Sequence, residues 1–363
     1  MLTLGVLSGT SVDAIDVALV DWSQSHPILV VHDEYPWTER IRQQLLVLPE
    51  RPHLSLSEFG QLHTACGQAF AQAILSFCDK YQINTADIQA IGSHGQTVWH
   101  QPQGDYPFSL QIGHPAIIAK QTGITTVADF RMDDIALGGQ GAPLAPAFHA
   151  QLFADATQIV GVLNLGGIAN LTLLRPDKSV IGFDTGPANT LLDAWYRLQH
   201  NGDGYDKAGA WAAGAAVDEV LLAQWLTHPY FLRPYPKSTG REDFSLNWLA
   251  PHALVHYPAD VIQSTLLQLT VESVAIAWES FANTGRLWLC GGGALNSELI
   301  RRLKVRLPRC QVELTDACGY SIHALEAMLF AWLAKQRIDK KPINLMQITG
   351  SDKPVIAGGI WVS

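Results

Sequence analysis

A pattern that occurs twice constrains the fold of this 363-residue chain more than any other feature. In each copy, two short apolar runs flank a turn of glycine and small polar residues. The first copy covers 3–20 and has the turn GTSVD at 9–13, and the second covers 160–174 and has GGIAN at 166–170. Short apolar runs around a glycine-containing turn predict β-hairpins. Because helical patterns follow each hairpin, we expect two related α/β lobes.

The length of the chain also favours two domains, since a single hydrophobic core rarely serves so many residues. A segment rich in glycine and proline at 130–147 is the natural crossing between them. We therefore expect a first lobe at 1–129 and a second lobe at 130–340. A tail at 341–363 is expected to return to the first lobe.

Composition and charge argue against several classes of protein. Hydrophobic residues make up 48% of the chain and charged residues 16%, as in a well-packed globular enzyme. The 24 basic and 33 acidic residues give a net charge of −9, which argues against nucleic acid as a partner. The N-terminus lacks the basic region of a signal peptide, and no apolar run is expected to reach the roughly 20 residues that span a membrane. Five cysteines without metal-ligand spacing predict reduced thiols in a cytoplasmic protein.

Three polar turns carry the candidate chemistry. Backbone N–H groups and hydroxyls of the turn at 9–13 can approach phosphate oxygens, although this is no Walker A loop and an ordinary hairpin turn explains it equally well. The aspartate that begins the turn DTGP at 184–187 can serve as a general base or a metal ligand, or simply cap a helix. Three glycines at 291–293 leave room for an adenosine or a phosphate, or serve close packing alone.

Two further patterns predict structure rather than chemistry. Ser55 and Glu58 form a capping box ahead of apolar residues at helical spacing, which predicts a helix from about Leu56. Four histidines have spacings that fit no zinc pattern and are expected in turns or in packing. They are His94, His100, His114 and His149.

Longer motifs occur in order along nearly the whole chain. They are GTSVD at 9–13, GSHGQT at 92–97, DFR at 129–131, GGQGAPL at 138–144, NLGGIAN at 164–170, GFDTGP at 182–187, PKSTGRE at 236–242, CGGGA at 290–294, LEA at 325–327 and FAWLA at 330–334. In these motifs the chain resembles the anhydro-N-acetylmuramic acid kinases, a family of the actin, hexokinase and Hsp70 superfamily.

The resemblance implies an α/β protein with the two-lobed, actin-like ATPase fold, in which ribonuclease H-like domains enclose a central nucleotide and sugar cleft. It implies an enzyme that uses ATP, Mg²⁺ and water to open 1,6-anhydro-N-acetylmuramic acid and phosphorylate O6. The products would be N-acetylmuramic acid 6-phosphate and ADP, in peptidoglycan recycling. The expected partners are an amino sugar and ATP, and a homodimer is a further expectation.

The resemblance also assigns roles to residues. Asp184 matches the family's catalytic base, and Glu326 matches a glutamate near Mg²⁺, which it would contact through water. Gln96, Thr97 and Arg131 are expected near the sugar, where a guanidinium suits the lactyl carboxylate. The other matches are ATP-binding residues: Gly9, Thr10, Ser11, Val12, Asp13, Ala14, Ile15, Asp16, Gly166, Gly167, Asn170, Gly186, Gly291, Gly292, Gly293 and Ala294.

The chain departs from the family pattern at a few positions. Ala14 stands where the family has glycine in the phosphate loop, and Ala208 replaces a polar residue. Two alternatives remain open. A kinase for another anhydro sugar, such as levoglucosan, would leave Arg131 unexplained, and a sugar sensor without catalysis would leave the intact Asp184 turn unexplained.

Overall fold

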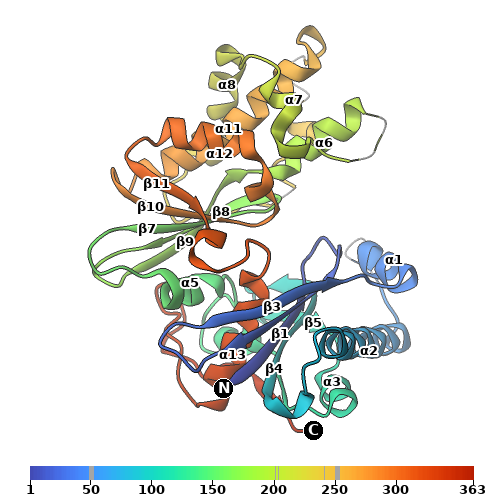
Figure 1. Ribbon diagram of the computed structural model, residues 1–363. Coiled ribbons are helices and arrows are strands. Elements are labelled where there is room, and N and C mark those ends of the chain that lie inside the picture. The colour runs from blue at the N-terminus through green and yellow to red at the C-terminus, as the bar shows by residue number, and fades with distance from the viewer. Residues whose placement is uncertain (49–52, 201, 203, 241, 250–253) are drawn as a thin grey trace. The chain divides into compact units, whose positions relative to one another are not determined.

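The computed structural model describes residues 1–48, 53–200, 202, 204–240, 242–249 and 254–363 (Figure 1). Within these residues the chain forms two compact units. Unit 1 consists of Met1–Leu152 and Ala324–Ser363, and unit 2 consists of Phe153–His323. These boundaries differ from the expected ones, since the chain leaves unit 1 after residue 152 rather than after 129 and returns at 324 rather than at 341.

Unit 1 is built on a seven-stranded mixed sheet in the order β12-β6-β4-β1-β2-β3, with β5 paired to β4. The first three strands form an antiparallel meander, whereas β4 is parallel to β1 and β6 is parallel to β4. The short last strand pairs with β6, so the end of the chain lies in unit 1. The strands are β1 (Leu2–Ser8), β2 (Ile15–Asp21), β3 (Ile28–Tyr35), β4 (Ile88–Gln101), β5 (Phe108–Ile112), β6 (Thr126–Ala128) and β12 (Gly359–Trp361).

The longest helix of unit 1 packs on one face of this sheet and begins as predicted. In α2, the Ser55 hydroxyl accepts a hydrogen bond from the Glu58 N–H, and the Glu58 carboxylate accepts one from the Ser55 N–H, which confirms the capping box. Apolar residues of α2 share a buried cluster with alternate residues of β1 and β2. The helices of this unit are α1 (Glu39–Val47), α2 (Leu56–Lys80), α3 (Pro115–Thr122), α4 (Phe130–Ile135), α5 (Ala145–Phe153) and α13 (Leu325–Ile338).

Helix α13 packs against the sheet of unit 1 because two adjacent strands each have a glycine where the helix backbone approaches them. Gly5 of β1 is paired in the sheet with Gly92 of β4. A Cβ atom on Gly5 would overlap the carbonyl of Ala327, and one on Gly92 would overlap the carbonyl of Phe330. The helix backbone therefore rests directly on the two strands. This contact joins segments more than 200 residues apart, which is why the sequence pattern assigned the helix to the wrong lobe.

Unit 2 repeats the topology of unit 1 in a five-stranded sheet of order β11-β10-β7-β8-β9. Again the first three strands are antiparallel, and the next two run parallel to the first. This shared order confirms the predicted fold class, two α/β units of ribonuclease H-like topology as in actin-like ATPases. The strands are β7 (Val160–Leu165), β8 (Ile168–Leu174), β9 (Val180–Pro187), β10 (Gly285–Cys290) and β11 (Cys310–Leu314).

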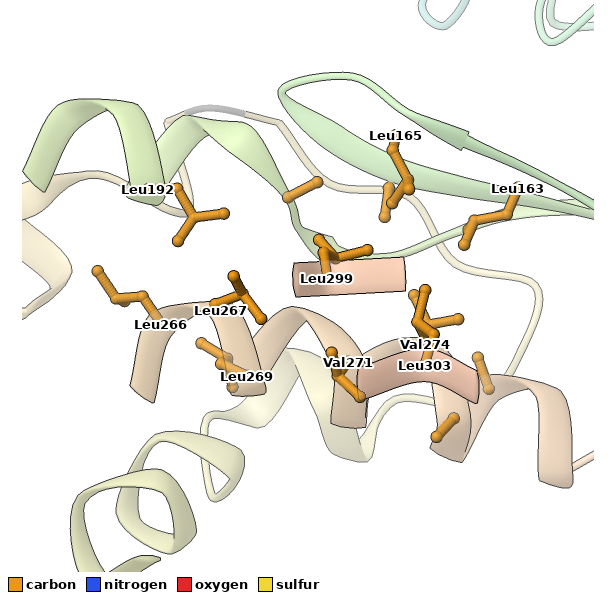
Figure 2. Close-up of a cluster of buried hydrophobic side chains, with 14 of the residues drawn as sticks. Leu163, Leu165, Leu192, Leu266, Leu267, Leu269, Val271, Val274, Leu299 and Leu303 are labelled. Carbon is orange, nitrogen blue, oxygen red and sulfur yellow. The ribbon is translucent and has the colours of Figure 1, made fainter. Parts of the chain in front are cut away.

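The core of unit 2 lies between its sheet and two helices. Figure 2 shows Leu163 and Leu165 of β7 near side chains of α11 and α12, which belong to the same buried cluster. Leu299 and Leu303, one turn apart, are the core-facing residues of α12. The helices of this unit are α6 (Asn189–Gln199), α7 (Ala210–Ala213), α8 (Glu219–Leu226), α9 (Pro229–Leu232), α10 (Leu246–Leu249), α11 (Ala259–Glu279) and α12 (Ser297–Arg306).

Helix α11 has 21 residues and is apolar enough to cross a membrane by length and composition alone. The expectation that no apolar segment reaches that length was therefore wrong. However, 78% of its most apolar window is buried inside the protein. A mostly apolar helix that is largely buried in this way is typical of a domain core.

The contact between α13 and the sheet generates a stability prediction. Gly92→Ala should destabilise unit 1 by about 1–3 kcal/mol, because the new methyl group meets backbone that cannot rotate away. Gly60→Ala is a matched control, since a Cβ at this position in α2 meets nothing within 4 Å. That change should stabilise the helix by up to about 1 kcal/mol. Urea unfolding of both variants measures the difference, and equal stability would contradict the packing described here.

Candidate active site

The candidate functional residues of each unit lie at the carboxyl ends of parallel strands. In unit 1, β1 ends at Ser8, which is paired with Gln96 of β4, and β6 ends next to Asp129. In unit 2, β7 leads into Gly166 and β10 leads into Gly291, while Asp184 lies near the end of β9, which is parallel to β7. Ligands of α/β proteins bind at this edge of the sheet.

The predicted phosphate loop of unit 1 joins β1 to β2. Val12 is buried and has a φ of +56°, an uncommon backbone conformation for a β-branched residue. Its N–H donates to the Gly9 carbonyl at 3.1 Å, while Thr10 and Asp13 are exposed. The loop thus anchors itself through one apolar side chain and presents a hydroxyl and a carboxylate to solvent. Such backbone strain is typical of functional loops.

Two carboxylates of unit 1 lie close to each other near this loop. Asp16, at the start of β2, lies 3.2 Å from Nε2 of His32, and Glu326 lies in the first turn of α13. Loss of hydration raises the pKa of Glu326, the negative charge of Asp16 raises it further, and Arg131 opposes this. Ligand atoms of Asp16, His32 and Glu34 also lie within 4.8 Å of one another. Carboxylate oxygens at such spacing suit a hard divalent cation.

The structure ties Gln96 and Thr97 to the phosphate loop and to the neighbouring hairpin. Nε2 of the buried Gln96 donates to the Gly9 carbonyl at 3.2 Å. Oε1 of Gln96 has no hydrogen-bond partner among the described residues. The Thr97 hydroxyl accepts from Nε2 of Gln111 in β5 at 3.2 Å. Two of the predicted site segments, 87 residues apart, are thus brought together.

Most of the Arg131 guanidinium is engaged within unit 1. Its Nε donates to Nε2 of His94 at 3.1 Å, and its Nη1 donates to the Gly141 carbonyl at 2.8 Å. Since Nε2 of His94 accepts a hydrogen bond, the proton of the neutral imidazole lies on Nδ1. Burial lowers the pKa of His94 well below its ordinary value, and the charge of Arg131 lowers it further, against a smaller opposing effect of the Gly95 backbone. His94, expected in a turn or in packing, therefore orients Arg131.

A cavity of about 410 Å³ opens beside these residues in unit 1. Aromatic and apolar side chains form part of its wall, among them Phe59, Phe108, Met132 and Trp361. Its polar lining includes Ser93 and His94, and Ser93 Oγ and His94 Nδ1 lack hydrogen-bond partners among the described residues. Apolar walls with a few unpartnered polar atoms are typical of small-molecule sites.

Asp184 is half-buried, and a hydrogen bond reaches each of its carboxylate oxygens. Asn170, its partner in the β8–β9 register, donates from Nδ2 to Oδ1 at 2.9 Å. The N–H of Thr239 donates to Oδ2 at 3.0 Å. Burial raises the pKa of Asp184 above its ordinary value, although the two hydrogen bonds lower it. Asp184 lies within β9 rather than in a turn, so it is a strand residue and not a helix cap.

The segment 230–239 contacts Asp184 at several points. No role was predicted for this segment from the sequence. The Tyr230 hydroxyl donates to the Asp184 carbonyl at 2.7 Å, and the Asp184 N–H donates to the Lys237 carbonyl at 2.9 Å. The motif PKSTGRE at 236–242 was the available signal, but neither its spacing nor its composition indicates a contact with β9. Arg241 of this motif lies outside the described residues.

The glycine turn after β10 lines a second cavity, of about 420 Å³, in unit 2. Gly291 has a φ of +79°, and a Cβ there would overlap the side chain of Asn164, so the turn requires glycine. Gly292 is exposed and Gly293 is buried. The other lining residues are Asn189, Leu192, Asp193, Tyr205, Asp206, Lys207, Ala208, Leu295 and Asn296, none of which the sequence had singled out for binding.

The glycines of the β7–β8 turn support this cavity through α6. The carbonyl of Gly166 accepts from the Asn189 N–H at 3.1 Å, and that of Gly167 accepts from Thr190 at 3.1 Å. Asn170 of the same predicted set contacts Asp184 instead. Ala208, one of the departures from the family pattern, lines the cavity with a φ of +58°, whereas Ala14 is not among the positive-φ residues of the described chain.

Two units of one ribonuclease H-like topology, each with small-residue loops and a cavity at the carboxyl edge of its sheet, are the fold of the actin-like ATPases. The family can be stated more closely. A family model described as anhydro-N-acetylmuramic acid kinase matches residues 1–363, and the chain belongs to this family.

Curated relatives bearing the same name agree with this assignment. The anhydro-N-acetylmuramic acid kinase of Coxiella burnetii (strain Dugway 5J108-111) is 50% identical over 363 residues, which cover 99% of this chain and 96% of the relative. That of Pasteurella multocida (strain Pm70) is 46% identical over 366 residues, covering 99% and 97%. The predicted family is therefore confirmed.

The cavity of unit 2 generates a binding prediction. A Cβ on Gly292 meets nothing within 4 Å, so Gly292→Val should fold normally and fill part of the cavity. If ATP binds there, its KM should rise by about tenfold or more, the equivalent of about 1.4 kcal/mol. Gly214→Val adds the same side chain to unit 2 outside the cavity lining and serves as the control. An unchanged KM for ATP in the Gly292 variant, with an unchanged Tm, would remove the nucleotide from this cavity.

Proposed function

We propose that the protein is an ATP-dependent kinase that opens 1,6-anhydro-N-acetylmuramic acid with water and phosphorylates O6. The observation that carries the proposal is the half-buried Asp184 carboxylate, oriented by Asn170 and Thr239, in a chain that belongs to this kinase family. The products are N-acetylmuramic acid 6-phosphate and ADP, and the reaction belongs to the recycling of peptidoglycan.

The substrate explains why a kinase needs a base here. In the anhydro sugar, O6 is bonded to C1, so no free hydroxyl is available to accept the phosphoryl group. Asp184 takes a proton from water as the water oxygen bonds to C1 and the C1–O6 bond breaks. O6 then bonds to the γ-phosphorus, and the bond from that phosphorus to the β-phosphate oxygen breaks, which releases ADP. This combines the water activation of an inverting glycosidase with phosphoryl transfer.

The surroundings of Asp184 suit a base. Burial raises the pKa of Asp184, which strengthens its affinity for a proton, while two hydrogen bonds oppose this shift by favouring the ionised form. Each carboxylate oxygen accepts one of these bonds and retains a lone pair for water. The same two bonds fix the direction in which the carboxylate points.

We assign nucleotide-binding groups in each unit by itself. The glycine turn 291–293 and its cavity receive the adenosine, and the loop at 9–16 receives phosphate oxygens. Asp16 and Glu326 are the carboxylates that would hold Mg²⁺, through water in the case of Glu326. Bound Mg²⁺ would neutralise charge that develops on the phosphates. The proximity of the two carboxylates supports this assignment, because the charge of Asp16 raises the pKa of Glu326.

We assign the sugar to the cavity of unit 1, next to Gln96 and Thr97. Aromatic rings such as Trp361 offer flat apolar surfaces to the sugar ring, and the unpartnered polar atoms of Ser93 and His94 offer hydrogen bonds to its hydroxyl or amide groups. Nη2 of Arg131, which makes no hydrogen bond within the described part of the chain, is the group that would meet the lactyl carboxylate. We place the enzyme in the cytoplasm, acting on small molecules, and its assembly as a homodimer remains a proposal.

The role of Asp184 generates the first test. Asp184→Asn keeps the shape of the side chain but cannot take a proton, so kcat should fall by about 10²- to 10⁴-fold. Circular dichroism and ATP affinity should stay unchanged. Asp177→Asn makes the same chemical change at an exposed turn of unit 2 and should leave kcat alone. Near-normal turnover by a folded Asp184→Asn protein would remove Asp184 from this role.

The origin of the oxygen atoms generates the second test. In ¹⁸O-labelled water, mass spectrometry should find the label on C1 of the product and none in the bridge between C6 and phosphorus. Product incubated in labelled water without enzyme controls for exchange at C1. Label in the phosphate ester bridge would show that water attacks elsewhere, and the scheme would then be wrong.

A further inference from the structure

Lys237 is a buried cation without an acidic partner. Its side chain is only 7% exposed, and among the described residues no carboxylate lies within ion-pair distance of Nζ. Burying an unpaired charge costs free energy unless other groups replace the lost water. A lysine at such a position therefore calls for an explanation beyond packing.

Backbone carbonyls and aromatic rings replace the water around this ammonium group. Nζ donates to the carbonyl of Tyr230 at 3.0 Å and to that of Phe231 at 3.2 Å, both within α9. It also lies 4.6 Å from the ring centroid of Tyr230 and 4.4 Å from that of Tyr235. The cation is thus enclosed by one short segment, 230–237, which it holds in a closed bend.

Residues at the two ends of that bend form hydrogen bonds with the backbone of Asp184. At one end, the Tyr230 hydroxyl donates to the Asp184 carbonyl, and at the other the Lys237 carbonyl accepts from the Asp184 N–H. Two residues further on, the Thr239 N–H donates to the Asp184 carboxylate itself. Asp184, Tyr230 and Lys237 thus form a closed cycle of contacts. The hydrogen bond from the Lys237 ammonium group to the Tyr230 carbonyl completes this cycle.

We propose that Lys237 is a positioning residue that fixes the Asp184 carboxylate by holding Tyr230 and the 237–239 backbone together. This inference rests on the proposed role of Asp184 as base. Lys237 does not itself meet the substrate, because its Nζ points into the bend, where two carbonyls and two rings enclose it. Burial lowers the pKa of Lys237 to about 8, with a further contribution from Arg233, so the ammonium form still prevails at neutral pH.

The inference makes a prediction about the titration of Asp184. Thr239 lowers the pKa of Asp184, so a loosened Thr239 N–H raises that pKa further. Removing the ammonium group should therefore move the acid limb of kcat to higher pH. Among the described residues, the other titratable or charged groups around this cluster are His228, Tyr230, Tyr235, Arg233 and Asp243. Lys237→Met leaves all of these groups in place.

The test compares Lys237→Met with Arg286→Met, which removes a hydrogen-bonding cation from unit 2 at the exposed edge between β10 and β11. Lys237→Met should lower kcat by about 10- to 100-fold, as losses of outer-shell partners do, with KM for ATP unchanged. Its acid limb should move upward, whereas Arg286→Met should change neither kcat nor the limb. A folded Lys237→Met protein with wild-type kcat and acid limb overturns the proposal, and a rise in KM for ATP alone would mean that Lys237 binds substrate.

A second variant keeps the proposal testable if Lys237→Met does not fold. Tyr230→Phe removes only the hydroxyl of the same ring and should also raise the pKa of Asp184. That pKa can be followed without substrate by ¹³C NMR of labelled aspartate, with Asp184→Asn to assign the signal. If the pKa of Asp184 is unchanged in a folded Tyr230→Phe protein, the contacts among Asp184, Tyr230 and Lys237 do not position the carboxylate, and the proposal is overturned. Because this readout needs no sugar, it stands apart from any failure of the proposed reaction.

Discussion

The proposed chemistry of this protein depends on how one carboxylate is kept partly out of water. Burial alone would push Asp184 toward its neutral form, and the two hydrogen bonds from Asn170 and Thr239 oppose this. The result is a carboxyl group with a raised pKa and a fixed direction, which suits a base for water. Each donor depends on a different part of unit 2. Asn170 is set by the register of two adjacent strands, whereas Thr239 is set by a bend that closes around a buried lysine.

Much of the architecture could be predicted because its signals are local. The two hairpin turns, the capping box at Ser55 and the glycine turn after β10 are each encoded within a few residues, and each lies where the pattern placed it. The repeat of the hairpin pattern correctly indicated two related α/β units, since the two sheets share one strand order. Asp184 was assigned as the base through its match to the family motif GFDTGP, and it lies near the carboxyl end of β9.

What the sequence could not supply are contacts between distant segments. Gly5 and Gly92 each weaken a strand when considered alone, and only their pairing shows that they make room for α13. For that reason the sequence placed the end of the second lobe at 340, whereas unit 2 ends at His323. Likewise, Asn170 was assigned to the nucleotide, because nothing local reveals that it is paired with Asp184. Lys237 was part of a quoted motif, yet its role depends on carbonyls of a helix seven residues earlier and on a strand more than fifty residues away.

The most direct test of the central claim is to identify the product. The protein is incubated with ATP, Mg²⁺ and 1,6-anhydro-N-acetylmuramic acid, and the mixture is followed by ³¹P and ¹H NMR. The account predicts ADP and N-acetylmuramic acid 6-phosphate in equal amounts, with an opened ring and phosphorus coupled to the C6 protons. ADP with free inorganic phosphate and an intact anhydro sugar would contradict it.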